Sequence, residues 1–368
     1  MNNTLDKKYL GEAAKLSGIS GIRSGHVTWE CPSNIALIKY WGKKGFQKPL
    51  NPSLSLTLHG AITRLSVDFK RLEGNREVTL DYLFENMPNH SFHDRFLKYL
   101  QLVSRYLPFL NTLHLSIQSH NTFPHSSGVA SSASAFGALA LSLCSIEQIC
   151  FDTPDTGTEF LRKASFLSRL GSGSASRSVY GGYSLWGKAE EIPLSSDEAA
   201  IPINSEIADV FRNYCDSILI IQTGKKEISS TTGHALMKDH PFASARIIQA
   251  NRNCVDLIRS LREGDSMRFV EIIENEALTL QALMLSSLPG YFLFHANTLE
   301  VIKKVREFRR ETEIGIGFTL DAGANVHLLY PSGVANEVRE FIDTALLPCC
   351  ESGLVFHDIT GNGPLRIE

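Results

Sequence analysis

Three short polar segments stand inside otherwise apolar sequence, and each carries charged residues that could take part in chemistry. The segment SNIALIKYWGKK contains Lys39 and Lys43, four residues apart. The segment GSGSASRS contains Arg177, the only charged residue in residues 171–186, and TLDAGANVH contains Asp321 after an apolar run. Together, ammonium groups, a guanidinium and a carboxylate could bind an anionic substrate and direct phosphoryl transfer to one of its hydroxyl groups.

Each of these residues also has a plain structural interpretation. On a helical turn Lys39 and Lys43 would point the same way and repel each other, so they would either share an anion or form a solvated lysine face. Arg177 could cap loop carbonyl groups, and Asp321 could simply form a turn before Ala-Gly. Their joint occurrence, together with the loop described next, favours a catalytic set.

The stretch PHSSGVASSAS at residues 124–134 lies between a predicted strand and a predicted helix. Residues 113–118 alternate between apolar and polar, and apolar residues recur at helical spacing after the loop. A flexible linker between domains would not be enclosed in this way. Backbone amides at a helix N-terminus attract anions, and the hydroxyls of Ser131 and Ser132 could add donors or bind magnesium. The loop therefore predicts phosphate binding, although it is not a GxxxxGK[ST] loop.

Composition narrows the class of protein. The chain has 368 residues, of which 43% are hydrophobic and 20% charged, and a formal net charge of -3. Without a dense lysine and arginine run, a nucleic acid partner is not expected. No segment resembles a secretory signal or the roughly 20 apolar residues of a membrane span, so we expect a cytoplasmic protein without a membrane partner. The 7 cysteines form no CxxC pair, which indicates reduced structural thiols, and the 12 histidines form no metal-binding motif.

The elements that must position these residues alternate irregularly between strands and helices. Strands are predicted within residues 26–45, 53–69, 113–121, 179–186, 216–224 and 353–359, and a hairpin at 315–331. Helices are predicted at 94–107, 131–146, 158–170, 231–286, 297–310 and 336–347. A polar stretch at residues 195–212 marks a boundary between an N-terminal domain, 1–205, and a C-terminal domain, 206–368. Both domains are expected to be α+β.

These motifs also carry a family resemblance. PHSSGVASSAS resembles the second motif of the GHMP small-molecule kinase superfamily, and TLDAGANVH resembles its third. SNIALIKYWGKK, NPSLSLTL and GSGSASRSVYGG are similar to signatures of the diphosphomevalonate decarboxylase family, and together the motifs extend from Ser33 to Val326. The resemblance implies ATP-dependent decarboxylation of (R)-mevalonate 5-diphosphate to isopentenyl diphosphate, with ADP, phosphate and CO2 as co-products and magnesium as a cofactor.

The resemblance also implies a fold and an assembly. The N-terminal domain would be like ribosomal protein S5 domain 2, and the C-terminal domain would have the α+β fold of the GHMP superfamily. The active site would lie between the two domains. Homodimers are common in the family, so a homodimer is expected.

Residue roles follow from the same resemblance. Asp321 would lie beside the tertiary 3-hydroxyl group of the substrate as a base or orienting group, Arg177 would hold the substrate carboxylate, and Lys39 would complete the catalytic set. The substrate pocket would further include Asn34, Tyr40, Lys43, Ser172 and Ser174, with Lys43 on a phosphate. ATP phosphates would be bound by Ser127, Gly128, Val129, Ala130, Ser131 and Ser132, and magnesium by Ser131 and Ser132.

The sequence departs from the family pattern in several places. The loop has His-Ser-Ser where many relatives have Thr-Ala-Ala, Ser176 replaces a frequent Cys, and Pro52 replaces a frequent Ser. Pro52 and a short segment between WGKK and NPS lie near the expected 5-phosphate, so mevalonate 5-phosphate is a second candidate substrate. Two further functions fit the motifs: a GHMP kinase that phosphorylates without decarboxylating, and a non-catalytic nucleotide-binding module.

Overall fold

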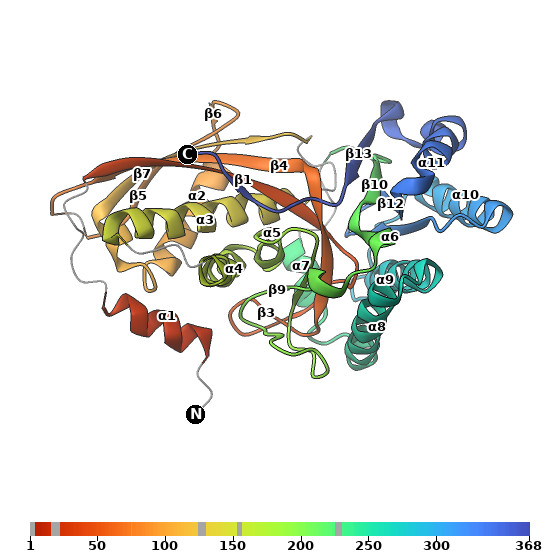
Figure 1. Ribbon diagram of the computed structural model, residues 1–368, viewed down its shortest axis with the longest axis horizontal. Helices are drawn as coiled ribbons and strands as arrows, with labels where there is room; N and C mark the ends of the chain where they lie inside the picture. Colours follow the sequence, from red (N-terminus) through yellow and green to blue (C-terminus); the bar gives the residue numbers. More distant parts are fainter. Residues whose placement is uncertain (1–3, 16–22, 75, 124–129, 153–156, 225–229) are drawn as a thin grey trace.

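The computed structural model describes residues 4–15, 23–74, 76–123, 130–152, 157–224 and 230–368, without the side chains of residues 230 and 231. Within these residues the chain forms a larger sheet of eight strands and a smaller one of four, each covered by helices (Figure 1). The N-terminal half builds most of the larger sheet, and the C-terminal half builds the smaller one. The result is the expected mixed α and β fold with two parts.

Two long antiparallel strands, β1 (Ser24–Ala36) and β4 (Ser53–Arg71), form the centre of the larger sheet. The strand order is β14-β1-β4-β7-β5-β6, with β8 paired to the first part of β4 and β9 paired to β8. The other strands are β5 (Thr79–Phe84), β6 (Met87–Pro88), β7 (Leu113–Asn121), β8 (Tyr183–Trp186), β9 (Ile201–Pro202) and β14 (Leu365–Arg366). A separate small hairpin consists of β2 (Lys43–Lys44) and β3 (Lys48–Pro49). The predicted alternation in β7 is confirmed by its burial pattern.

Helices cover one face of the larger sheet (Figure 1). They are α2 (His90–Val103), α3 (Ser131–Phe151), α4 (Thr158–Gly171) and the short α5 (Ala175–Ser178). An additional helix, α1 (Leu5–Ala13), packs through Tyr9 against the ring of Phe166 in α4. Helix α1 was not among the elements predicted from the sequence.

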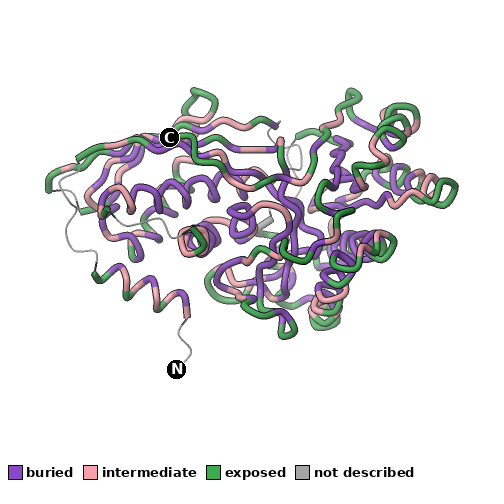
Figure 2. Tube along the Cα trace, in the orientation of Figure 1, coloured by how far each residue is buried: buried purple, intermediate pink, exposed green. Residues whose placement is uncertain are grey.

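Helix α3 is buried on nearly every side (Figure 2). Of the helices in the described part of the chain, it alone is long and apolar enough to cross a membrane, but 83% of that apolar window is buried inside the fold. The prediction that no apolar segment approaches this length was therefore wrong, because α3 is a core helix of the larger sheet. Gly137 permits its close approach to β1, since a Cβ there would lie 2.6 Å from the sulfur of Cys31.

The smaller sheet has the order β11-β12-β10-β13 and contains the predicted hairpin. Its strands are β10 (Tyr214–Leu219), β11 (Gly317–Leu320), β12 (Val326–Pro331) and β13 (Val355–Ile359). The helices of this half are α6 (Asp209–Arg212), α7 (Ser230–Leu236), α8 (Ala243–Glu263), α9 (Ser266–Leu285), α10 (Ala296–Thr312) and α11 (Ala335–Phe341), which continues into a π-helical turn at Ile342–Leu346. Short 3-10 helices occur at Pro108–Thr112, Asn204–Glu206, Ser332–Val334, Leu347–Cys349 and Glu351–Gly353.

Two features add detail that the sequence predictions did not contain. The helical region predicted for residues 231–286 consists of three helices, and Gly264 separates the last two in a left-handed conformation with a φ of 78°. The C-terminal strand β14 returns to the larger sheet and pairs with β1. The two parts are therefore linked by both the middle and the end of the chain, and the domain boundary near residue 205 stays a prediction.

Asp358 in β13 connects the smaller sheet to the larger one. Its carboxylate accepts hydrogen bonds from the backbone amides of His59, Gly60 and Ala61 in β4 at 3.0, 2.7 and 2.9 Å. At this point β4 changes partner, because β8 pairs with its first residues and β7 with its last. The carboxylate thus satisfies amides that the sheet does not pair.

We expect Asp358→Ala to lower the free energy of unfolding by about 2 to 3 kcal/mol, because three amides lose a charged acceptor. Asp358→Asn keeps one acceptor oxygen and should lose less. Urea unfolding followed by circular dichroism measures both. An unfolding midpoint for Asp358→Ala equal to that of the wild type would show that this carboxylate does not hold the two sheets together.

Candidate active site

The side chains of Lys39 and Asp321 meet between the two parts of the fold. Lys39 Nζ lies 2.9 Å from Asp321 Oδ1 and 2.6 Å from the carbonyl oxygen of Ala36. The Lys39 side chain is 2% exposed and that of Asp321 is 31% exposed. Burial lowers the pKa of the Lys39 ammonium, and the charge of Asp321 opposes this effect. A buried cation thus orients a carboxylate that solutes can reach.

The backbone around Asp321 is fixed by neighbouring side chains. Asp321 follows β11 in the turn of the hairpin, and its carbonyl accepts a hydrogen bond of 3.1 Å from Gln281 Nε2 in α9. Asn325 Oδ1, at the end of the turn, accepts from the amides of Ile221 and Gln222 at 2.9 and 3.0 Å. The predicted hairpin therefore presents its acid from a turn that is anchored at both ends.

Lys39 lies in a non-helical segment after β1. The arrangement considered for Lys39 and Lys43, with both on one helical turn, is therefore not the one that forms. Residues 37–42 form no helix, and Lys43 already belongs to β2. The amides of Leu37 and Ile38 donate to the carbonyl of Leu54, which holds the segment against β4. Tertiary contacts and Gly42, with a φ of 92°, determine this conformation. Lys39 and Lys43 therefore do not form one helical face.

Arg177 is a buried guanidinium within electrostatic reach of Asp321. The residue is 1% exposed, its Nε lies 3.4 Å from Asn34 Oδ1, and its Nη1 has no hydrogen-bond partner among the described residues. Burial lowers the pKa of Arg177 to about 10, which leaves it charged at neutral pH, and Asp321 opposes the effect. No loop carbonyl is capped by its guanidinium in the described part of the chain. Such a buried, unsatisfied donor suits a bound anion.

Asn34 connects Arg177 to the short helix α5. Its side-chain amide donates to the carbonyl of Ser174 at 3.2 Å and to the hydroxyl of Ser178 at 2.8 Å. These bonds direct Asn34 Oδ1 toward Arg177. The predicted residues Asn34, Ser174 and Arg177 therefore lie side by side.

A row of serine hydroxyls joins this cluster to the start of α3. Ser132 Oγ lies 3.3 Å from Ser172 Oγ, which lies 3.3 Å from Ser174 Oγ. The N-cap residue of α3 is Ala130, whose side chain cannot accept a hydrogen bond from the first-turn amides. The start of α3 thus keeps donors for an anion. Ser131 and Ser132 lie there as predicted, whereas Ser127, Gly128 and Val129 fall outside the described residues.

Tyr40 packs close to Gly173, which lies between Ser172 and Ser174. Its ring contacts Trp186 edge-on with centroids 4.7 Å apart, and burial raises the pKa of its hydroxyl. A Cβ at Gly173 would come within 2.6 Å of Trp186 and 2.9 Å of Tyr40. Gly173 is therefore needed for the close approach of its backbone to the rings of Trp186 and Tyr40.

His234 in α7 is a residue of this site that the sequence analysis missed. Its ring contacts Tyr40 and Trp41 with centroids 4.3 and 4.7 Å away, and its Nδ1 accepts a hydrogen bond of 2.9 Å from the amide of Gly42. Burial, with a contribution from the charge of Lys43, lowers the pKa of His234 to about 3. Burial also lowers the pKa of Lys43, which is itself half-buried. The segment STTGHAL offered no recognisable signal, because a histidine acceptor for a backbone amide has no motif.

Comparison with known proteins now identifies the family. Residues 31–200 match the diphosphomevalonate decarboxylase-like N-terminal domain, and residues 217–360 match the mevalonate 5-diphosphate decarboxylase C-terminal domain. A diphosphomevalonate decarboxylase of Debaryomyces hansenii is 30% identical over 314 residues, which cover 81% of this chain and 78% of that protein. The chain belongs to the diphosphomevalonate decarboxylase family.

Solved structures of the diphosphomevalonate decarboxylase family have the same fold. Mevalonate diphosphate decarboxylase from Staphylococcus aureus superposes with a TM-score of 0.79 at 27% identity, covering 94% of this chain and 98% of that one. Mevalonate diphosphate decarboxylase from Legionella pneumophila has a TM-score of 0.75 at 30% identity, covering 90% of this chain and 100% of that one. A third relative, MDDEF in complex with MVAPP, AMPPCP and magnesium, has a TM-score of 0.76 at 26% identity, covering 94% of this chain and 99% of that one. The family and the two-part GHMP-type fold predicted from the motifs are confirmed.

His234 should make stability depend on pH in this family member. Its folded-state pKa of about 3 lies below the ordinary value of 6.5. As the pH falls below 6.5, His234 therefore takes up a proton in the unfolded chain but not in the folded protein. As the pH falls, the free energy of unfolding of the wild type should decrease by up to about 1.4 kcal/mol per pH unit relative to that of His234→Asn. The asparagine keeps an acceptor for the Gly42 amide but cannot be protonated. Urea unfolding between pH 7.5 and 5 tests this, and parallel pH curves for the two proteins would contradict it.

Proposed function

We propose that this protein catalyses the ATP-dependent decarboxylation of (R)-mevalonate 5-diphosphate to isopentenyl diphosphate, ADP, phosphate and CO2. The observation that carries the proposal is the convergence of Lys39, Asp321 and Arg177 on one site between the two sheets. Membership of the family supports the reaction class. MDDEF, the relative in complex with MVAPP, AMPPCP and magnesium, supports the substrate and the cofactors.

Asp321 is proposed to act on the tertiary 3-hydroxyl group of the substrate. The ion pair with Lys39 fixes the direction of its carboxylate, so the carboxylate can orient the hydroxyl and accept its proton during phosphoryl transfer. Such a base typically contributes about 10²- to 10⁴-fold to the rate. After Asp321 has released this proton to solvent, its carboxylate is negative again, and it would stabilise the positive charge that develops at C3 when phosphate departs with the electron pair of the C–O bond.

Arg177 is proposed to bind the substrate carboxylate. Its buried Nη1 is available as a donor, and Asn34 holds the opposite side of the guanidinium. At about 4 Å an ion pair in a partly screened site contributes on the order of 4 kcal/mol before desolvation is subtracted. As CO2 leaves, the electron pair of the broken C–C bond forms the alkene, so Arg177 must orient the carboxylate without stabilising it more than the transition state.

The remaining residues are proposed to bind phosphates and to shape the pocket. Ser131 and Ser132 at the start of α3 would hold ATP phosphates and magnesium, an ion that usually keeps several waters and takes few protein oxygens. The terminal phosphoryl group of ATP, when bound, converts the poor hydroxyl leaving group into phosphate. Lys43 would bind a substrate phosphate, and Tyr40, Ser172 and Ser174 would line the pocket. The predicted cytoplasmic location and homodimer are part of this proposal.

The reaction itself is tested by measuring ADP and CO2 with mevalonate, its 5-phosphate and its 5-diphosphate. We expect equal amounts of both products and the highest kcat/KM with the 5-diphosphate. A preference for the 5-phosphate would support a decarboxylase of mevalonate 5-phosphate. ADP without CO2 would indicate a kinase that stops after phosphorylation, and no ADP from any substrate would indicate a non-catalytic module.

The role of Asp321 is tested by Asp321→Asn, which keeps the size of the side chain but removes the base. We expect turnover to fall about 10²- to 10⁴-fold while affinity for a non-hydrolysable ATP analogue stays close to that of the wild type. Rapid-quench CO2 measurement and calorimetric binding give the two quantities. Near-normal CO2 release from this variant would refute the assignment.

A further inference from the structure

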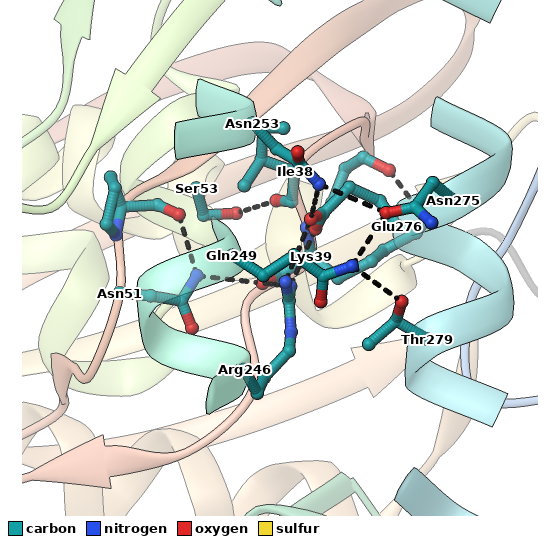
Figure 3. Close-up of polar contacts among 12 residues, drawn as sticks. Ile38, Lys39, Asn51, Ser53, Arg246, Gln249, Asn253, Asn275, Glu276 and Thr279 are labelled. Carbon is teal, nitrogen blue, oxygen red and sulfur yellow. Dashed lines mark hydrogen bonds and ion pairs between the residues drawn. The ribbon is translucent and has the colours of Figure 1, made fainter. Parts of the chain in front are cut away.

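A buried ion pair from two helices holds the backbone of Lys39 (Figure 3). Glu276 Oε2 in α9 accepts a hydrogen bond of 2.9 Å from the Lys39 amide, and Arg246 Nη2 in α8 donates to the Lys39 carbonyl at 3.2 Å. Arg246 and Glu276 bind each other through two hydrogen bonds of 2.8 and 2.6 Å. Both polar backbone groups of Lys39 are thus bound by one ion pair from the C-terminal half.

Lys39 needs such partners because it lies outside the strands, where no ladder pairs its backbone. Two asparagines complete the arrangement. Asn51 Nδ2 donates to the Lys39 carbonyl at 3.1 Å, and Asn253 Nδ2 donates to Glu276 Oε1 at 2.8 Å (Figure 3). Every carboxylate oxygen of Glu276 therefore has at least two donors.

Stability alone is a poor reason for this ion pair. The side chains of Arg246 and Glu276 are 1% and 0% exposed, and removing two charges from water costs about as much as their attraction returns. An apolar pair of similar volume would pack α8 against α9 equally well. The feature that an apolar pair could not supply is a charged donor and a charged acceptor for the backbone of Lys39.

Helix α9 also holds Asp321, the residue whose carboxylate meets the Lys39 ammonium. Gln281, five residues after Glu276 and so about 7.5 Å further along the helix axis, donates to the carbonyl of Asp321 at 3.1 Å. Glu276 thus fixes the backbone of Lys39, and Gln281 fixes the backbone of Asp321. One helix sets the distance between the two residues whose side chains meet at 2.9 Å.

We propose that Arg246 and Glu276 are positioning residues for the decarboxylation, because they fix the backbone of Lys39 so that its ammonium meets Asp321. This inference rests on the proposed function of the same site. The negative charge of Glu276 acts on the ammonium too, since it raises the pKa of Lys39 against the effect of burial. Neither Arg246 nor Glu276 needs to touch the substrate for this role.

The test compares Glu276→Gln with a matched control, Glu274→Gln. Glu274 lies on the same helix, is also buried, and pairs with Arg309 and Arg306 at 2.6 and 3.0 Å. We expect Glu276→Gln to lower kcat about 10²-fold, as a shift of about 1 Å in a reacting group does, with little change in the KM for ATP. Glu274→Gln should lose comparable thermal stability and keep its kcat. Equal losses of kcat in both variants would overturn the proposal.

Two further measurements keep the test independent of folding and of turnover. The double variant Arg246→Met/Glu276→Leu removes both charges without leaving either one unpaired, although the Lys39 amide loses its acceptor, so it should fold with a moderately lower melting temperature and lose kcat; wild-type kcat in a folded double variant would overturn the proposal. Competitive acetylation of Lys39, read by mass spectrometry, needs no catalysis. Lys39 should react faster in Glu276→Gln than in the wild type or Glu274→Gln, and an unchanged rate would contradict positioning even if the wild type released no CO2.

Discussion

The contact between the ammonium of Lys39 and the carboxylate of Asp321 is the interaction on which the site depends. Lys39 comes from the segment that follows β1 of the larger sheet, and Asp321 comes from the hairpin of the smaller sheet. The ion pair therefore exists only if the two parts of the fold are correctly placed. The anchoring of the Asp321 turn, the return of β14 to β1 and the bonds from Asp358 to β4 all serve this placement.

Burial gives the site its chemical character. Lys39 and Arg177 are both almost fully enclosed, and Asp321 is the charge that opposes the burial effect on each of them. Two buried cations beside one carboxylate leave a demand for more negative charge, which a substrate with a carboxylate and phosphates can meet. The overall charge of -3 says nothing of this local balance. Local enclosure, not net charge, makes the site suited to an anionic ligand.

Much of this could be predicted from the sequence, because local patterns carry local information. The alternation before the glycine-serine loop predicted β7, the helical spacing after it predicted α3, and the apolar run before Asp321 predicted the hairpin. The isolation of Arg177 among small residues marked it as a candidate for binding an anion, whereas its burial became apparent only in the structure. Each of these signals lies close in the chain to the feature that it predicts.

The features that escaped prediction depend on distant contacts. The spacing of Lys39 and Lys43 was compatible with a shared helical face, but hydrogen bonds to β4 hold the segment in a non-helical conformation. No sequence pattern near Glu276 or Arg246 predicts a hydrogen bond to Lys39, which lies 237 and 207 positions away. His234 accepts from an amide 192 positions away, and β14 pairs with a strand at the other end of the chain. Such pairings are set by the packed fold, so no local motif records them.

A double-mutant cycle on Lys39→Met and Asp321→Asn, measured by single-turnover CO2 release, tests the central claim most directly. If the two side chains act as one unit, the double variant should be about as slow as the slower single variant, with a coupling free energy of roughly 1 to 3 kcal/mol. If the rate reduction of the double variant equals the product of the two single-variant reductions, the two residues act independently. The contact between them would then not be the basis of the site.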